Sequence, residues 1–433
     1  MDWLLQLPLM ESRTLLILSI VSGAVAVLLI IRPGLRRVLL SLLGAAIGAG
    51  IGALVFWWVV NVQDVFGVDL SDTARMWVIA GFAGIGLALA NLFSSRLRRK
   101  VLALLAIPVL LLAPAAGINA DFGAYHTLGQ LFGSSQVPQL DTIRSGEHGE
   151  VVSGVPNYAT SWTPPEDMPL YGEIGEVAIP TTVSGFTAAR PAQVWLPPAA
   201  LVDNPPVLPV IFILSGQPGS PAENFEMGRL SQVLDDYARS HRGLAPIAVA
   251  VDQLGDPGSN PLCIDSQAHG KVQSYLTQDV PAWVRANFRV SDDPSMWMLQ
   301  GFSQGATCTV QFITEFPQIF GSGITTGTQL GPLLHEEADT VAEGFGGDQL
   351  AYDRAQPLAI MLAHGQYANS TLLLGVGKTD DRYRAYSDQL ADAARTAGIH
   401  VQRLTADTGH DWYAAHDIFA QGLSILGDRM GLR

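Results

Sequence analysis

The residues best suited to chemistry are Gly301-Phe302-Ser303-Gln304-Gly305, the one Gly-x-Ser-x-Gly sequence in the chain. An apolar, strand-like segment (residues 296–300) precedes them directly, and a stretch with helical spacing follows. Strand, tight turn and helix is the setting of a nucleophile elbow, in which the flanking glycines allow a strained turn that exposes the serine hydroxyl. We therefore expect Ser303 to be the nucleophile of an acyl-transfer reaction. The alternative is a Gly-Ser turn that merely ends a buried strand.

A serine hydroxyl needs a histidine base, because it is a weak nucleophile at neutral pH. His410 is the favoured base because it follows a strand-like segment near the C-terminus, where a loop could carry the imidazole back over Ser303. His416 falls in an expected helix, and His400 begins a strand. The two remaining competitors, which precede the expected acid, are His335 and His364.

A carboxylate must hold that base, and in the chain order serine, acid, histidine it should follow the strand-like residues 372–376. Asp380 and Asp381 are both candidates. We favour Asp380, because Asp381 can instead interact with the dipole at the start of the next helix. Asp407 is a more distant alternative.

The oxyanion of a tetrahedral intermediate needs preorganised donors, usually backbone N–H groups. The first expected donor is Gln304, which follows the nucleophile. The second should come from the loop Ser215-Gly216-Gln217-Pro218-Gly219, where Gln217 is favoured because proline has no N–H. A plain turn is the equally weighted alternative for this loop.

Alternating strand-like and helix-like segments beyond residue 170 predict a mostly parallel sheet of about eight strands covered by helices, with the first two strands forming an antiparallel edge. The expected strands are residues 177–179, 193–196, 210–214, 247–251, 296–299, 323–325, 372–376 and 400–404. The expected helices are residues 222–242, 272–287, 306–316 and 381–397, with another after Trp412.

The N-terminal part of the chain has a different composition. Four apolar stretches, residues 15–31, 38–60, 76–93 and 101–118, are each long enough to cross a membrane as a helix. A signal peptide is the alternative for the first, but the apolar core of a signal peptide is shorter and would not be followed by three more spans. We expect a four-span bundle (residues 1–120), a linker (121–170) and an α/β domain (171–433).

The distribution of charge predicts the orientation of this bundle. The cations gather between the first and second spans and between the third and fourth, and short basic loops stay in the cytoplasm. Both termini and the α/β domain should then lie on the extracytoplasmic side. No Asp, Glu, Lys, Arg or His lies inside a span, which favours an anchor over a transporter.

The net charge also bears on partners. The first 120 residues carry a net charge of +4. The remaining residues carry −18, which gives the total of −14. A domain this acidic would repel phosphate, which argues against nucleic acid as a partner.

Cys263 and Cys308 are the only cysteines. An even count outside the cytoplasm favours a disulfide between them, with two buried thiols as the alternative. Neither a metal site nor a cofactor is indicated.

Four sequence features together resemble the esterase family of α/β-hydrolases that includes S-formylglutathione hydrolases, feruloyl and acetyl-xylan esterases and trehalose mycolyltransferases. They are residues 214–216 before the oxyanion loop, residues 277–281 opening a helix, residues 301–305, and residues 409–412. The resemblance implies an α/β-hydrolase fold, a triad of Ser303, Asp380 and His410, and an oxyanion hole of Gln217 and Gln304.

The combined hypothesis is a membrane-anchored serine esterase or acyltransferase, acting on a cell-envelope lipid or acylated glycan. The composition is consistent with an actinobacterial source. Trp162, Trp195 and Trp412 are candidates for lining a sugar site. The alternative is a non-catalytic binding or scaffold module on the same fold. The sequence leaves open the acceptor, hydrolysis versus transfer, and the oligomeric state.

Overall fold

A computed structural model describes residues 2–68, 70–93, 96–132, 137–143 and 149–432. The chain divides into two compact units, Met1–Ser135 and Gln136–Arg433, which are described separately below. The division falls inside the segment expected to be a linker. Of the described residues, 121–132 therefore group with the helices of unit 1, and 137–143 and 149–170 group with the α/β fold of unit 2.

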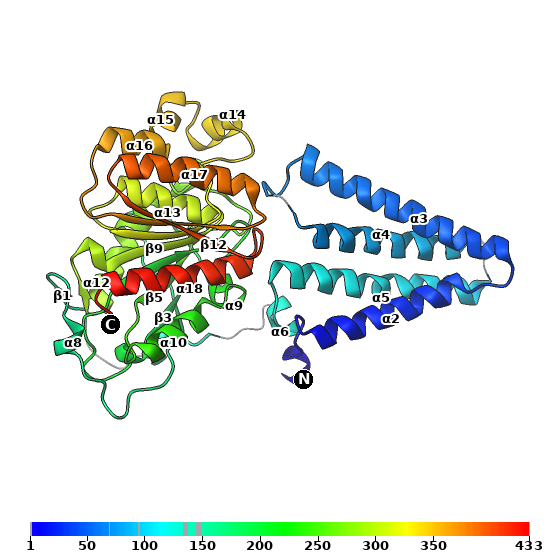
Figure 1. Cartoon of the computed structure of the whole chain (residues 1–433), viewed down its shortest axis with the longest axis horizontal. Helices are drawn as coiled ribbons and strands as arrows, with labels where there is room; N and C mark the ends of the chain where they lie inside the picture. Colours follow the sequence, from blue (N-terminus) through cyan, green and yellow to red (C-terminus); the bar gives the residue numbers. More distant parts are fainter. Residues whose placement is uncertain (1, 69, 94–95, 133–136, 144–148, 433) are drawn as a thin grey trace. The chain divides into compact units, whose positions relative to one another are not determined.

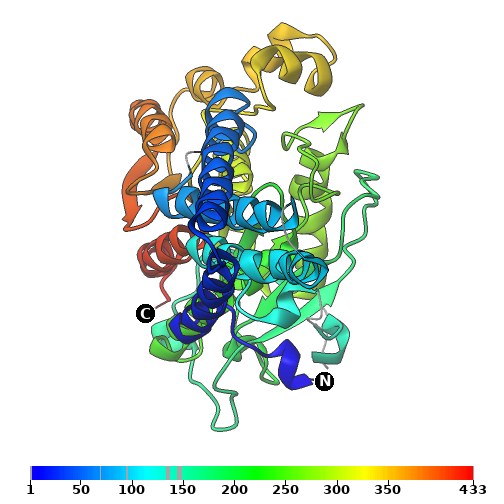
Figure 2. The same ribbon diagram turned by 90° about the vertical axis from the view of Figure 1, so that its right-hand side faces the viewer.

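Unit 1 is built on four long apolar helices, each of which is long and apolar enough to cross a membrane. They are α2 (Ser12–Ile30), α3 (Leu35–Trp57, continued by the π-helix Trp58–Val62), α4 (Asp72–Phe93) and α5 (Leu97–Phe122). Helix α2 packs on α5, α5 on α4, and α4 on α3 (Figures 1 and 2). Two short helices, α1 (Asp2–Leu5) and α6 (Leu128–Leu131), complete the unit.

Small residues account for the closest contact in this bundle, between α3 and α4. A Cβ placed on Gly48 would lie 2.2 Å from the carbonyl oxygen of Phe82, and one on Gly86 would lie 2.2 Å from that of Gly44. At one end of the bundle, Arg99 donates hydrogen bonds to Leu29 O (2.7 Å) and to the buried Asn91 Oδ1 (2.9 Å). Arg99 therefore caps the C-terminus of α2, whose last carbonyls have no partner within the helix.

Unit 2 has an eight-stranded sheet in the order β12-β11-β10-β9-β4-β5-β3-β2. Its strands are β2 (Glu173–Val177), β3 (Ala192–Leu196), β4 (Val210–Leu214), β5 (Ile247–Val251), β9 (Trp297–Phe302), β10 (Ser322–Thr326), β11 (Thr371–Gly377) and β12 (His400–Ala406). The last six are parallel, and β3 and β2 form the antiparallel edge, as expected from the sequence. The one displaced strand is the first, which lies four residues before its expected start.

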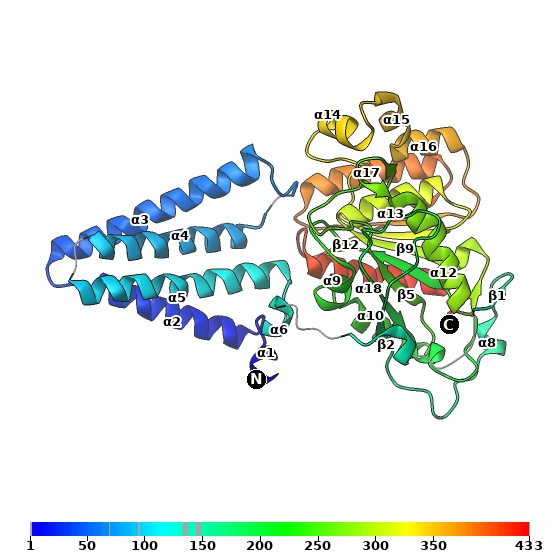
Figure 3. The ribbon, with the colours of Figure 1, turned by 180° about the vertical axis from the view of Figure 1, so that it is seen from behind.

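Helices cover both faces of this sheet (Figure 3). One face carries α13 (Gln304–Glu315), α16 (Pro357–His364) and α17 (Asp381–Thr396), and the other carries α9 (Pro221–Glu226), α10 (Leu230–Ser240) and α18 (Trp412–Arg429). The core is dominated by the central strands, whose side chains are almost wholly buried. The helix expected over residues 222–242 is in fact two helices, because the chain turns at Gly228 and Arg229.

The remaining elements are short or irregular. Helix α11 (Val272–Ser274), the π-helix η3 (Tyr275–Asp279) and α12 (Val280–Asn287) together fill the helix expected over residues 272–287. The other elements are α7 (Leu140–Ile143), β1 (Val151–Val152), α8 (Tyr158–Ser161), η2 (Pro198–Ala200), β6 (Asp265–Ser266), β7 (Gly270–Lys271), β8 (Val290–Ser291), η4 (Pro294–Met296), α14 (Glu337–Asp339), η5 (Thr340–Gly344) and α15 (Gln349–Arg354).

The segment before β2 packs on unit 2 instead of hanging free. Tyr158 is 1 % exposed and donates a hydrogen bond to Val207 O (2.6 Å). The Trp162 indole N–H donates to Arg242 O (3.0 Å). The large aromatic side chains of Tyr158 and Trp162 are thus buried against the domain that follows.

Candidate active site

The parallel strands end at the same edge of the sheet, and the candidate residues lie just beyond those ends. Leu214 at the end of β4 pairs with Gly301 of β9, and Thr326 of β10 pairs with Phe302 and Gly375. Ligands of open parallel sheets bind beyond the carboxyl ends of the strands. The sheet therefore gathers the 215–219 loop, Ser303 and the loops after β11 and β12 at one edge.

Ser303 occupies a strained turn between β9 and α13. Its φ is 55° and its ψ is −114°, values that a non-glycine residue rarely adopts. The Ser303 N–H donates to Thr326 O (2.8 Å), which holds the turn against β10. A Cβ on Gly301 would lie 2.0 Å from Gly305 O, and one on Gly305 would lie 2.4 Å from Leu214 O. Both motif positions therefore require glycine, as a nucleophile elbow does.

The side chains of Asp380 and His410 contact each other at this edge. His410 Nδ1 lies 2.8 Å from Asp380 Oδ2, and the two side chains are 6 % and 1 % exposed. Asp380 directly precedes α17, whereas Asp381 is the first residue of that helix, is largely exposed and pairs with Arg384 (2.9 Å). Asp407 is also exposed and pairs with Lys378 (3.2 Å). Of the three candidate acids, Asp380 alone contacts the histidine in this structure.

The His410 ring lies among the neighbours of Ser303. It is 5.1 Å from the Phe302 ring and 4.4 Å from the Tyr383 ring, measured between centroids. It also covers Gly327, where a Cβ would lie 2.4 Å from His410 Cε1. The Nε2 atom is buried and makes no hydrogen bond with any residue in the described part of the chain. This nitrogen is thus the one left to take part in proton transfer.

Asp411 supports the loop that carries His410. Its carboxylate accepts from Ala414 N (2.8 Å), which caps α18, and from Gly409 N (3.0 Å). Burial raises the pKa of Asp411, and these two hydrogen bonds oppose that rise. The competing histidines have other surroundings. His400 begins β12 and is exposed, and His416 lies in α18 with Nδ1 3.0 Å from Gly228 O.

The expected oxyanion donors lie on two sides of Ser303. Gln304 is the first residue of α13, so its N–H has no carbonyl partner within the helix. Gln217 lies in the loop after β4, where its side-chain amide donates to Gly258 O (3.0 Å). Neighbouring Gly216 faces the nucleophile, since a Cβ there would lie 3.4 Å from Ser303 Cβ. The assignment of the two N–H groups to an oxyanion stays a prediction.

A buried ion pair that sequence reasoning missed fixes the far side of this loop. The Arg190 guanidinium donates two hydrogen bonds to the wholly buried Asp252, from Nε to Oδ2 (2.8 Å) and from Nη2 to Oδ1 (2.7 Å), and the Arg190 backbone N–H donates a third to Oδ2 (2.8 Å). Its Nη2 also donates to Gly219 O (2.9 Å). The signal for Asp252 was available, because it is a charged residue at the carboxyl end of a wholly apolar strand. Arg190 lies before β3 and gave no such signal.

Two further carboxyl groups near this edge have shifted pKa values. Burial raises the pKa of Glu223, on α9, to about 7, and the Ser220 hydroxyl and the charge of Arg190 oppose the rise. Burial also disfavours ionisation of Asp279, but hydrogen bonds from Ser184, Val183 and Thr182 outweigh it and lower its pKa. Asp279, in the segment that resembled the esterases, therefore fastens the 182–184 loop.

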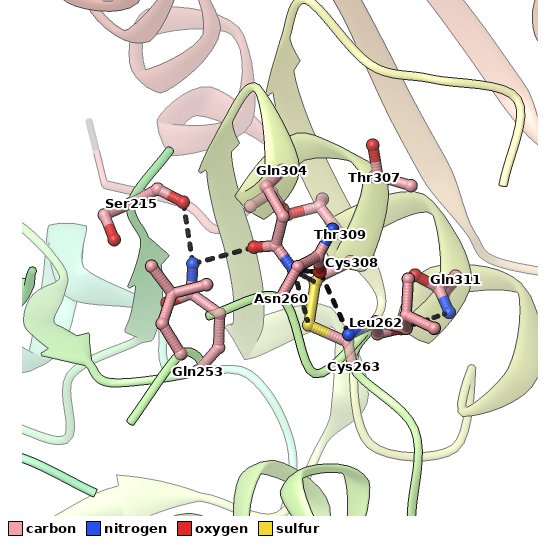
Figure 4. Close-up of a disulfide and its surroundings, with 12 residues drawn as sticks. Ser215, Gln253, Asn260, Leu262, Cys263, Gln304, Thr307, Cys308, Thr309 and Gln311 are labelled. Carbon is pink, nitrogen blue, oxygen red and sulfur yellow. Dashed lines mark hydrogen bonds between the residues drawn. A yellow bond between two sulfur atoms is a disulfide. The ribbon is translucent and has the colours of Figure 1, made fainter. Parts of the chain in front are cut away.

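The disulfide expected from the cysteine count is present. Cys263 and Cys308 are bonded, with their Cα atoms 5.7 Å apart, and both are buried. Cys308 lies on α13, so the bond ties the helix behind Ser303 to the loop after β5 (Figure 4).

Of the candidate sugar-binding tryptophans, Trp195 and Trp162 are buried and cannot line a surface, whereas Trp412 contacts the Phe302 ring at 4.9 Å.

Comparison with known proteins identifies the class. Residues 186–418 match the family model described as "Putative esterase". Two solved structures share the fold over nearly their whole length. An S-formylglutathione hydrolase from Agrobacterium tumefaciens (TM-score 0.50, 18 % identity) covers 61 % of this chain and 98 % of its own. A ferulic acid esterase (TM-score 0.50, 16 % identity) covers 60 % and 99 %.

The chain therefore belongs to this esterase family and has the α/β-hydrolase fold. An uncharacterized protein of Corynebacterium glutamicum is 30 % identical over 368 residues, which cover 82 % of this chain and 83 % of that protein. This share exceeds the length of unit 2, so the similarity extends into the N-terminal helices.

Proposed function

We propose that this protein is a membrane-anchored serine esterase or acyltransferase with Ser303 as nucleophile, His410 as general base and Asp380 as the carboxylate that orients the base. The observation that carries the proposal is the arrangement around His410. Nδ1 is held by a buried carboxylate at 2.8 Å, Nε2 is buried without a hydrogen bond among the described residues, and the ring packs on Phe302, which precedes a serine in the elbow conformation.

The proposed reaction has two steps. The Ser303 oxygen attacks the ester carbonyl as His410 Nε2 takes its proton, and the imidazolium then gives that proton to the departing alcohol, which leaves an acyl-enzyme. Water or an acceptor hydroxyl next attacks the acyl group and loses its proton to His410, which then gives that proton to the departing Ser303 oxygen. The main-chain N–H groups of Gln304 and Gln217 stabilise the oxyanion formed in each step.

The four apolar helices support the proposed location. They would anchor the chain in a membrane, with the basic residues 32–37 and 96–100 on the cytoplasmic side and unit 2 on the extracytoplasmic side. A disulfide in unit 2 supports that side, because disulfides persist in oxidising compartments. From such a position the enzyme would act on a lipid or an acylated glycan of the cell envelope.

Labelling of intact cells with a membrane-impermeant fluorophosphonate tests nucleophile and orientation together. We expect wild type to be labelled, Ser303→Ala to be unlabelled and His410→Ala to be labelled much more slowly. His400→Ala is the matched control, because it removes an exposed histidine of unit 2. Labelling only after lysis would overturn the orientation. Absence of labelling in both preparations would overturn the proposed nucleophile.

A further inference from the structure

A chain of side-chain amides connects the two expected oxyanion donors (Figure 4). Gln253, two residues after β5, is wholly buried. Its Nε2 donates to Ser215 O (2.7 Å) and to Gln304 Oε1 (3.0 Å). Ser215 begins the loop that carries Gln217, and Gln304 directly follows the nucleophile. One NH₂ group therefore holds both sides of the expected oxyanion hole.

The chain continues from Gln304 to the disulfide. Gln304 Nε2 donates to Asn260 Oδ1 (3.1 Å) and lies 3.3 Å from Cys308 Sγ. Asn260 is itself fixed, because its Oδ1 accepts from Leu262 N (3.0 Å) and its Nδ2 donates to Leu333 O (3.2 Å). The Cys263–Cys308 bond closes the connection by tying this loop to α13.

We propose that Gln253 is a positioning residue that keeps the Gln304 N–H and the 215–217 turn in register, with the Cys263–Cys308 disulfide as the anchor at the far end of the amide chain. This inference rests on the proposed function, because it assigns the two N–H groups to the oxyanion. Such donors act only when they are preorganised, and a misplacement of about 1 Å can cost roughly 100-fold in rate.

The surroundings of Gln253 argue against a role in folding alone. Ser215 O also accepts from Gly305 N (3.1 Å), so it keeps a partner when Gln253 is replaced. Gln253 Oε1 is buried and has no hydrogen-bond partner within the described ranges, so this side chain is not placed to satisfy its own polar atoms. Loss of the Gln253 amide should therefore release the Gln304 side chain and leave the fold in place.

Steady-state hydrolysis of a short-chain p-nitrophenyl ester by the full-length protein in detergent tests the proposal. We expect Gln253→Met to lower kcat by about 10- to 100-fold with KM within about twofold. Gln253→Glu, which keeps the shape but loses the donor, should lower kcat similarly. Gln311→Met is the matched control, because Gln311 is a buried amide of α13 that bonds Leu262 O (3.1 Å) and makes no hydrogen bond with Gln253 or Gln304. Its kcat should stay within about twofold.

The disulfide supplies the second half of the test. Cys263→Ala/Cys308→Ala should lower kcat by a few-fold, and its combination with Gln253→Met should lower kcat less than the product of the two effects, because both act through Gln304. Unchanged kcat in both Gln253 variants, or an equal loss in Gln311→Met, would overturn the positioning role alone. A wild type that neither hydrolyses the ester nor reacts with the fluorophosphonate would overturn the proposed function itself.

Discussion

Close backbone approach is spread along a helix face in unit 1, whereas at the candidate site of unit 2 it is confined to one turn. In unit 1, Gly44 and Gly48 of α3 face Phe82 and Gly86 of α4. In unit 2, Gly301 and Gly305 bring the elbow against itself and against the end of β4. The same residue type thus serves helix association in one unit and the placement of one side chain in the other.

This difference has consequences for mutation. Because the α3–α4 contact is repeated along two helices, one substitution should weaken only part of it. This contact carries no catalytic group. The contact at the elbow fixes the φ of Ser303 at 55°, so a small displacement there changes the geometry of the reaction. Substitutions at the site edge should therefore change activity more than stability, and substitutions in the bundle should do the reverse.

The largest expected effect is that of Asp380→Asn. The amide cannot stabilise the imidazolium of His410 and favours the wrong tautomer, so kcat should fall by about 10³- to 10⁴-fold. Asp381→Asn is a neighbouring control, because the Asp381 side chain is 82 % exposed and pairs with Arg384. It should change kcat by less than about twofold. Ester hydrolysis by the two purified variants is the measurement, and equal losses would return Asp381 as a candidate acid.

Gly48→Leu tests whether the close packing of α3 and α4 stabilises unit 1. The new side chain would have to displace the α4 backbone, since even a Cβ would lie 2.2 Å from Phe82 O. We expect a loss of about 1–3 kcal/mol in the stability of unit 1, measured by calorimetry of the full chain in detergent. Ester hydrolysis should stay within about twofold.

Gly50→Leu is the control for this substitution, because Gly50 lies in the same helix and a Cβ there would meet no atom of the described residues within 4 Å. It should leave the melting transition of unit 1 unchanged. If both leucine variants lower that transition equally, close approach between α3 and α4 does not stabilise the bundle.

An intermediate effect, on the pH dependence of stability, is expected from Glu223, a buried carboxyl group near the site. Its pKa of about 7 exceeds the ordinary value of 4.5, so between these pH values the folded protein holds a proton that the unfolded chain has released. The free energy of unfolding therefore falls as the pH rises from 4.5 to 7 and stays lower above pH 7. Glu223→Gln should remove this decline and stabilise the protein by up to ~3 kcal/mol at pH 8.

Thermal unfolding of wild type and Glu223→Gln at several pH values between 5 and 8 measures this effect. The two melting curves should lie close together at pH 5 and separate as the pH rises. Parallel curves over the whole range would show that Glu223 has no raised pKa.

The strands could be predicted because each depends on local sequence. The strands Val210–Leu214 and Ile247–Val251 were predicted to the residue, since each is a short apolar run. The break between α9 and α10 could not be predicted in this way. A Cβ on Gly228 would lie 2.7 Å from Asn224 O and 3.1 Å from Trp412, which is distant in sequence. Tertiary packing, not helix propensity, therefore sets this turn.

The same reasoning explains which site residues were missed. Ser303, Asp380 and His410 follow strands in a known order, so sequence position alone indicates them. Gln253 lies 51 residues before Gln304 and carries no motif, and its contact with Gln304 depends on β5 and β9 lying on either side of β4. Side-chain amides form hydrogen bonds in many different structural settings, so no spacing rule would have selected this pair.

The smallest expected effect is at Asp407, which lies after β12 at the same edge of the sheet as Asp380. Its side chain is 91 % exposed and its partner Lys378 is 69 % exposed, at 3.2 Å. Exposed pairs of this kind contribute about 0–1 kcal/mol, because water and salt screen them. Asp407→Asn should therefore change kcat by less than about twofold, and 1 M salt should remove any change in stability. A tenfold loss of kcat would mean that burial does not separate the catalytic carboxylate from its neighbours at this edge.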